Sequence, residues 1–216
     1  MYLLDEKLWF PNPEEASSEG ILAIGGDLSV KRLRLAYKSG VFPWFSEGDP
    51  IVWYSPDPRM VLFPERLKVS KSMRQILRKH EYEVTFNQDF EQVIEHCKTV
   101  DRKDQFGTWI TDEMKTAYIK LHNAGLAKSV EVWRFLDSAR NDKELVGGLY
   151  GIDLGTIFCG ESMFSKVSNA SKIAFIHLVE RLKEEQYKLI DCQVYNDHLA
   201  SLGAEEISRK EFLKYL

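Results

Sequence analysis

The sequence predicts a protein of the α/β (α+β) class, in which a small N-terminal region precedes a mixed β-sheet flanked by helices. Three observations favour this class. Residues 1–63 are rich in proline, glycine and aromatic residues, whereas residues 64–216 combine strand-like alternation with helical spacing of apolar side chains. In the second region three predicted strands follow one another directly, which differs from the steady strand–helix alternation of a doubly wound nucleotide-binding fold.

The N-terminal region, residues 1–63, contains one segment with helical spacing, at 29–38. Ser29 is a favourable N-cap residue, and Gly40 follows the segment as a helix terminator. Large aromatic residues lie close together after it, which is uncommon in mobile loops. They are Phe42, Trp44, Phe45, Trp53 and Tyr54. We therefore expect either a small packed domain or a surface around a pocket.

The segment after Pro64 predicts three helices and a strand. Apolar side chains recur at helical spacing in each helix, and a serine or threonine precedes two of the helices as an N-cap. The string YEVTF alternates, as a strand does. The predicted elements are a helix at 70–79, a strand at 82–86, and helices at 89–97 and 112–124.

The rest of the chain predicts an antiparallel meander, a crossover helix and a last strand. The polar stretch 134–144 is typical of a hairpin loop, and Gly155 belongs to a second tight connection. The predicted elements are strands at 129–133, 144–152 and 156–164, a helix that Asn169 opens, and a strand at 188–194. This order is compatible with an acyltransferase-type fold, in which a central pair of strands splays apart.

Composition excludes several classes of protein. The 216 residues are 44% hydrophobic, which is too apolar for a disordered tail. No apolar run approaches the roughly 20 residues that span a bilayer, and no secretory signal is visible at the N-terminus. Cys97, Cys159 and Cys192 form no CxxC pair, and their odd number argues against a disulfide framework. We therefore expect a reduced, cytosolic, globular protein.

Motifs for common cofactors are missing. The five histidines show no metal-ligand spacing, so we expect no metal site. Neither Gly25-Gly26 nor Gly147-Gly148 belongs to a nucleotide-binding pattern. The nucleophile elbow G-x-S-x-G of hydrolases is also missing. We expect no cofactor.

Polar residues in two predicted strands are candidates for chemistry. In KLIDCQV, strand alternation predicts that Asp191 and Gln193 share one face, although D-x-Q is a weak motif and a solvated face or a structural hydrogen-bond network would explain it equally. In FCGESMFS, Glu161 follows Gly160, and a glycine in a strand often marks a bulge or a close approach by a ligand. The alternative is that Glu161 lies at a sheet edge.

A basic cluster stands out against the formal net charge of −4. Residues 66–80 contain six lysines and arginines and no acidic residue. Its members on the predicted outer helix face are Lys71, Arg74, Arg78 and Lys79. A solvated helix face is one explanation, and a phosphate-binding surface is the other, because solvated helices usually mix both signs of charge.

Several strings, taken together, resemble the leucyl/phenylalanyl-tRNA–protein transferase family. They occur in that family's order over nearly the whole chain: GILAIGGDLS, AYKSGVFPWF, WYSPDPRMVLFP, GTWIT, LHNAGLAKSVEVW, LVGGLYGIDLGTIFCGESMFS, NASK, LIDCQV and NDHLASLGA. The resemblance implies a small N-terminal domain, 1–63, and an acetyltransferase-like (GNAT-type) catalytic domain, 64–216. It implies a cytoplasmic enzyme that moves Leu, Phe or, less well, Met from aminoacyl-tRNA to proteins that begin with Arg or Lys, which marks them for N-end rule degradation.

The resemblance also implies site residues. Asp191 and Gln193 fall on the family's catalytic pair, in which the aspartate orients the glutamine and the amide oxygen holds the attacking amine. Residues that match the family's substrate site are Glu161, Asn196, Trp44, Trp109, Leu149, Phe158, Met163, Phe175, Leu178 and Ile190. The two tryptophans would lie near the terminal adenosine of the tRNA, and Lys71, Arg74, Arg78 and Lys79 would hold its acceptor-stem phosphates.

Some features depart from the family pattern. The chain ends with SLGAEEISRKEFLKYL, the loop 134–144 is longer than usual, and Tyr54 stands where a second tryptophan is frequent. Two other functions stay open: an aminoacyl- or acetyltransferase with a different substrate, and a tRNA-binding module without catalysis. The sequence does not distinguish Leu from Phe as donor, and nothing in it demands more than a monomer.

Overall fold

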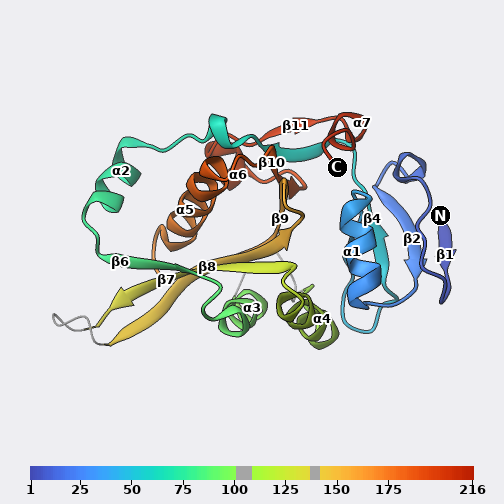
Figure 1. Ribbon diagram of the computed structural model, residues 1–216, viewed down its shortest axis with the longest axis horizontal. Coiled ribbons are helices and arrows are strands. Elements are labelled where there is room, and N and C mark those ends of the chain that lie inside the picture. Colours follow the sequence, from blue (N-terminus) through green and yellow to red (C-terminus); the bar gives the residue numbers. More distant parts are fainter. Residues whose placement is uncertain (101–108, 137–141) are drawn as a thin grey trace.

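The computed structural model describes residues 1–100, 109–136 and 142–216, and it contains two β-sheets. A four-stranded sheet has the order β1-β2-β4-β3, and a seven-stranded sheet has the order β11-β5-β10-β9-β8-β7-β6. Figure 1 shows the small sheet at the N-terminal end of the molecule and the large sheet with its helices beside it. The predicted class, a mixed α/β fold with sheet and flanking helices, is confirmed.

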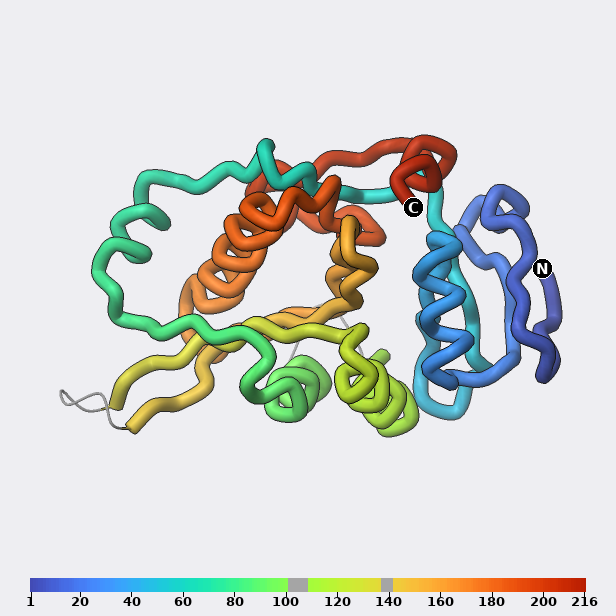
Figure 2. The backbone as a smooth tube through the Cα atoms, in the orientation of Figure 1, coloured from blue at the N-terminus to red at the C-terminus, as the bar shows by residue number. Residues whose placement is uncertain are grey.

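The small sheet is built from the first 54 residues. Helix α1 starts where predicted, because the Ser29 side chain accepts a hydrogen bond from the main-chain N–H of Arg32. Figure 2 shows α1 between the small sheet and the rest of the chain. The elements are β1 (Tyr2–Leu4), a short 3-10 helix (Pro13–Glu15), β2 (Ile21–Gly25), α1 (Val30–Lys38), β3 (Phe42–Pro43) and β4 (Val52–Tyr54).

The large sheet contains the predicted meander. Strands β7, β8 and β9 pair antiparallel in sequence order, and α5 then crosses over so that β10 runs parallel to β9. The elements are β5 (Arg59–Leu62), a 3-10 helix (Pro64–Arg66), α2 (Lys71–Arg78), β6 (Tyr82–Phe86), α3 (Phe90–Thr99), α4 (Asp112–Asn123), β7 (Ala127–Phe135), β8 (Lys143–Asp153), β9 (Ile157–Ser165), α5 (Ala170–Glu184), β10 (Leu189–Gln193), α6 (Asp197–Ser201), β11 (Glu205–Ile207) and α7 (Arg209–Phe212).

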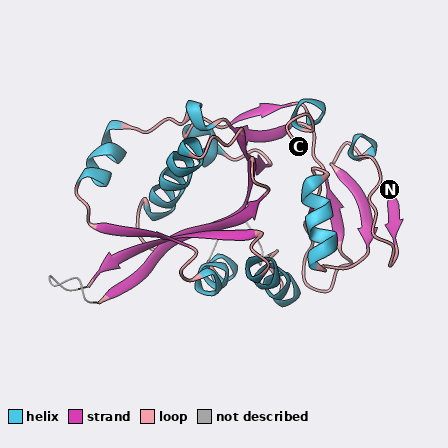
Figure 3. Cartoon of the chain, viewed as in Figure 1, coloured by secondary structure: helices cyan, strands magenta, loops and turns pink. Residues whose placement is uncertain are grey.

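Helices cover both faces of the large sheet. Alternate side chains of β8 point to opposite faces, so Leu149 packs in the core beneath α5 while Tyr150 packs in the core beneath α3 and α4. Figure 3 shows α5 on one side of the strands and α3 with α4 on the other. Each predicted helix and strand after Pro64 is present; the predicted loop at 134–144 lies partly outside the described residues.

The parallel strands β9 and β10 separate after a short pairing. Their register joins Leu189–Asp191 to Ile157–Cys159, whereas β9 continues to Ser165 without β10 beside it. Gly160 lies where the strands part, next to the carbonyl of Asp191. The expected separation of a central strand pair is therefore present, and it leaves room for a pocket.

The strand pairing bears on the predicted boundary between residues 63 and 64, which stays a prediction. Strand β5 precedes that boundary in the sequence, yet it pairs with β10 and β11 in the large sheet.

A search of the described helices finds none that is long and apolar enough to cross a membrane.

Candidate active site

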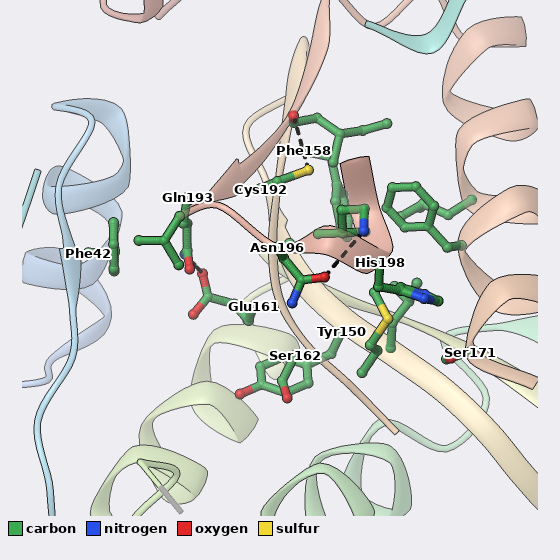
Figure 4. A pocket seen from close by; sticks show the side chains of 18 of the residues that line it. Phe42, Tyr150, Phe158, Glu161, Ser162, Ser171, Cys192, Gln193, Asn196 and His198 are labelled. Atoms are coloured by element: carbon green, nitrogen blue, oxygen red, sulfur yellow. Dashed lines mark hydrogen bonds between the residues drawn. The ribbon is translucent and has the colours of Figure 1, made fainter. Parts of the chain in front are cut away.

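A pocket of about 500 Å³ opens where β9 and β10 separate. Its walls come from β8, β9, β10, the start of α5 and the aromatic segment after α1. Figure 4 shows these side chains converging from strands and helices on one space. All ten residues assigned to substrate binding line it: Trp44, Trp109, Leu149, Phe158, Glu161, Met163, Phe175, Leu178, Ile190 and Asn196.

Gln193 lies at the rim of this pocket in an unusual backbone conformation. Its φ is 66°, and the pairing of β10 with β5 shifts register between Asp191 and Gln193. A left-handed residue at a bulge ends the regular alternation of side chains. Gln193 therefore lines the pocket, while Asp191 is fully buried and does not. The expectation that the two side chains share a face is wrong for this reason.

The Asp191 carboxylate is held by an arginine that the sequence analysis did not single out. Arg59 of β5 donates two hydrogen bonds to it, Nε to Oδ1 at 2.8 Å and Nη2 to Oδ2 at 2.7 Å, and both side chains are buried. Oδ1 also accepts the main-chain N–H of Gln193 at 2.9 Å. Asp191 thus contacts Gln193 through the backbone of the bulge and not through the side-chain amide.

Glu161 connects the two sides of the site. Its carboxylate accepts a hydrogen bond from Nε2 of Gln193 at 2.8 Å and another from the hydroxyl of Tyr118 at 2.9 Å. Tyr118 in turn shares a hydrogen bond with Tyr37 of α1. Burial raises the pKa of Glu161 to about 7, although hydrogen bonds from Tyr37 and Tyr118 favour the ionised form. Glu161 therefore changes charge near neutral pH and is not a simple sheet-edge residue.

The raised pKa predicts how stability depends on pH. In the folded chain Glu161 keeps its proton up to about pH 7, whereas a glutamate with the ordinary pKa of 4.5 has already lost it at a lower pH. Between pH 4.5 and pH 7, unfolding therefore releases this proton. Raising the pH from 5 to 8 should therefore lower the free energy of unfolding of the wild type relative to Glu161→Gln, by about 2.5 kcal/mol. Urea unfolding of both proteins at the two pH values measures this; an unchanged difference would contradict it.

Three residues of the site were missed by the sequence analysis: Arg59, Tyr37 and Tyr118. Arg59 opens a strand whose other residues are apolar, and this isolated charge in RMVL is the signal that was available. Tyr37 belongs to the predicted helix at 29–38, but nothing in the sequence indicates that it reaches Tyr118 across 81 residues. These contacts bring α1 and α4 to the same carboxylate.

Aromatic residues form the N-terminal wall of the pocket. Trp44 is 39% exposed, and its ring lies 5.6 Å from that of Tyr54. Tyr54 stacks in turn on Phe42 at 6.3 Å. Trp109 lines the same pocket from the segment before α4. Exposed and partly exposed indole faces at a pocket mouth are suited to stacking on a base.

The basic helix α2 lies apart from this pocket. Lys71, Arg74, Arg78 and Lys79 are all exposed, and none of them lines it. Lys79 lies 3.6 Å from the carboxylate of Glu81, just beyond the segment without acidic residues. Lys71, Arg74 and Arg78 make no ion pair with any other described residue, so neighbouring carboxylates do not neutralise their charges.

The chain is similar in sequence to proteins of one named family. The family model described as "Leucyl/phenylalanyl-tRNA protein transferase" matches residues 61–216, and the model of that family's N-terminal domain matches residues 26–57. Proteins named leucyl/phenylalanyl-tRNA–protein transferase are 61% identical in Flavobacterium johnsoniae and 58% identical in Flavobacterium psychrophilum, each over 100% of this chain and 99% of the relative.

A solved structure supports the fold. The crystal structure of FemX superposes with a TM-score of 0.52 at 10% identity, over 82% of this chain and 66% of that one. This likeness fits the acetyltransferase-like sheet that the sequence predicts. The family match over most of the chain, together with relatives that are similar along its whole length, shows that this chain belongs to the leucyl/phenylalanyl-tRNA–protein transferase family.

Proposed function

We propose that this enzyme transfers Leu, Phe or, less well, Met from aminoacyl-tRNA to the N-terminal Arg or Lys of a protein. As a member of its family it acts on aminoacyl-tRNA and a protein acceptor. One observation carries the finer proposal: an apolar pocket ends at a glutamine amide and a carboxylate that contact each other. The apolar pocket matches the donor side chain, the glutamine amide lies where the ester reacts, and the carboxylate matches the cationic acceptor.

The apolar part of the pocket fits the donor side chain. Leu149, Phe158 and Ile190 are almost fully buried, and Met163, Phe175 and Leu178 also line the pocket. A pocket shaped for side chains that are unbranched at the β-carbon accepts Leu, Phe and Met and excludes Ile and Val by steric clash. Such a clash discriminates more strongly than the absence of a methylene group does.

The chemistry is aminolysis of an ester. The acceptor nitrogen attacks the ester carbonyl, the new C–N bond forms, the C–O bond breaks, and the proton lost by the amine ends on the ribose hydroxyl that leaves. The Gln193 amide nitrogen donates to Glu161, so its oxygen is the atom that can accept an N–H of the attacking amine. An amide is a weak base, and its contribution is to position the nucleophile.

Glu161 supplies the charge that a cationic acceptor needs. When ionised, it pairs with the α-ammonium or the side chain of an N-terminal Arg or Lys. Asn196 caps α6 through its side-chain oxygen, which leaves its amide nitrogen to donate into the pocket. The substrate therefore meets one anionic group and two amides at the reacting end.

A transfer assay tests the proposal. The purified protein is incubated with a peptide that begins with Arg, and with tRNA charged with radiolabelled Leu, Phe, Met or Val, or with labelled acetyl-CoA. We expect label from Leu and Phe, less from Met and none from Val or acetyl-CoA. Transfer from acetyl-CoA alone would contradict the proposal, and tRNA binding without any transfer would indicate a non-catalytic tRNA-binding module.

Helix α2 predicts how tRNA is held. Replacing Arg74 and Arg78 by alanine should weaken binding of many tRNAs alike and reduce the slope of log affinity against log salt by about 1 for each lost phosphate contact. Replacing Lys210 and Lys214, which are exposed on or beside α7, removes the same charge and is the control. Filter binding at several salt concentrations measures this; a loss confined to one tRNA, or an equal loss in the control, would contradict it.

The biological setting follows from the same proposal. A protein extended by Leu or Phe becomes a substrate of N-end rule degradation, and the tRNA donor places the enzyme in the cytoplasm. The site is assembled from elements of a single chain, which is consistent with a monomer.

A further inference from the structure

Two apolar side chains that follow Gln193 are exposed at the rim of the active-site pocket. Val194 is 40% exposed and Tyr195 is 57% exposed, and both line the pocket. The transfer chemistry described above uses neither of them. Single exposed apolar side chains are common on protein surfaces, whereas an adjacent pair at the mouth of a reactive pocket indicates a surface that contacts a ligand.

The Tyr195 ring is held at its outer end. Its hydroxyl donates a hydrogen bond of 2.8 Å to Oδ1 of Asp197, the first residue of α6. The ring is therefore fixed in orientation although more than half of the residue is exposed. An aromatic side chain that is already fixed loses little conformational entropy when a ligand packs against its face.

The charges around Tyr195 distinguish between the two substrates. The pKa of its hydroxyl is raised, first by the hydrogen bond to Asp197 and then by the charge of that carboxylate, and Glu206 of β11 adds a smaller effect. A negative potential at this rim repels the phosphates of tRNA and attracts a cation. The rim therefore suits the acceptor and not the nucleic-acid donor.

The distance along the chain also suits the acceptor. Tyr195 lies two residues beyond Gln193, so their Cα atoms are at most about 7 Å apart. An acceptor whose α-amine lies at the Gln193 amide oxygen can therefore extend the long side chain of an Arg or Lys to the Tyr195 ring. Val194 lies between the two residues and offers an apolar surface to the methylene groups of that side chain.

We propose that Val194 and Tyr195 bind the side chain of the acceptor's N-terminal Arg or Lys, with its methylene groups on Val194 and its cationic head over the Tyr195 ring, beside the carboxylate of Asp197. This inference rests on the proposed function. It places the two ends of the acceptor residue separately: the α-amine lies at Gln193 and Glu161, and the side chain lies at Tyr195. No bond forms or breaks at Tyr195, which determines specificity and is not catalytic.

A peptide that begins with citrulline isolates the effect of charge, because citrulline has the shape of arginine without its positive charge. Leu transfer from Leu-tRNA is measured to two peptides that differ only in beginning with Arg or citrulline. The readout is the ratio of the two kcat/KM values. Tyr195→Leu removes the ring face, Tyr195→Phe keeps it, and Asp197→Asn keeps a hydrogen-bond acceptor without the charge.

Tyr2→Leu is the matched control. Tyr2 is 39% exposed and its hydroxyl also donates to a carboxylate, that of Glu15, but it belongs to β1 and does not line the pocket. Both tyrosines are exposed, so neither substitution removes a core residue. A difference between the two variants therefore reports the position of Tyr195 at the pocket.

We expect the Arg/citrulline ratio to fall about fivefold in Tyr195→Leu, through a higher KM for the Arg peptide at unchanged kcat, and to fall in Asp197→Asn as well. Tyr195→Phe should keep most of the ratio, and Tyr2→Leu should keep all of it. An unchanged ratio in Tyr195→Leu, or an equal fall in Tyr2→Leu, overturns the proposal. A higher KM for Leu-tRNA in place of the Arg peptide also overturns it, because Tyr195 would then stack on a nucleotide.

Failure of the proposed function gives a different result. A wild type that transfers Leu equally well to both peptides keeps its transferase activity and overturns only this inference. A wild type that transfers Leu to neither peptide refutes the proposed function, and calorimetric titration of the two peptides then tests the binding surface by itself. The Arg peptide must bind the wild type more tightly than the citrulline peptide does, and this preference must fall in Tyr195→Leu.

Discussion

Replacing Arg59 by methionine should destabilise the protein by about 3–5 kcal/mol, because it leaves the buried carboxylate of Asp191 without its partner. Both side chains are at most 1% exposed, so water cannot take the place of the guanidinium. The same guanidinium lies between the rings of Phe42 and Phe212, at 4.8 and 4.5 Å from their centroids, and donates to the carbonyl of Gly40 at 3.3 Å. The substitution therefore loosens contacts among β3, β5, β10 and α7. Urea unfolding measures the loss.

The matched control is Arg66→Met. Arg66 also pairs with a carboxylate, Glu205, but their side chains are 60% and 40% exposed, and an exposed pair contributes about 0–1 kcal/mol. Adding Asp191→Asn to Arg59→Met removes the unpaired charge and should restore part of the stability. Equal destabilisation by Arg59→Met and Arg66→Met would show that the buried pair has no special role.

The sequence predicted the helices and strands of the large sheet well, because each carries a local signal. Ser70 and Thr111 cap their helices through hydrogen bonds to the third residue beyond, as their positions suggested. The alternation in YEVTF produced the strand at 82–86. The crossover after β9 followed from the order of the elements alone.

The site was predictable only in part. The apolar residues of the pocket follow from the family strings, and the structure brings them together. The bulge at Gln193 was not predictable from alternation, because a positive φ at a glutamine has no signal in the local pattern. The pair of Arg59 with Asp191 joins residues 132 positions apart, and the tyrosines that reach Glu161 come from two separate helices. Such contacts depend on tertiary packing, which short-range patterns do not encode.

Gln193→Ala should lower turnover tenfold or more while leaving tRNA binding nearly unchanged. The substitution removes the amide that contacts Glu161 and that we propose positions the acceptor amine. It keeps the main-chain N–H that donates to Asp191, so the bulge and the buried ion pair stay in place. Loss of positioning without loss of donor binding lowers kcat more than it raises the KM for aminoacyl-tRNA. Single-turnover transfer from Leu-tRNA measures it.

Gln186→Ala is the matched control, because Gln186 also has a positive φ, 61°, and lies beyond the end of α5 away from the pocket. Both substitutions place alanine in the same left-handed backbone region, so any strain from that conformation is common to them. What differs is the contact with Glu161. If turnover fell equally in the two variants, the side chain of Gln193 would have no part in the reaction, and positioning would have to come from Glu161 and Asn196 alone.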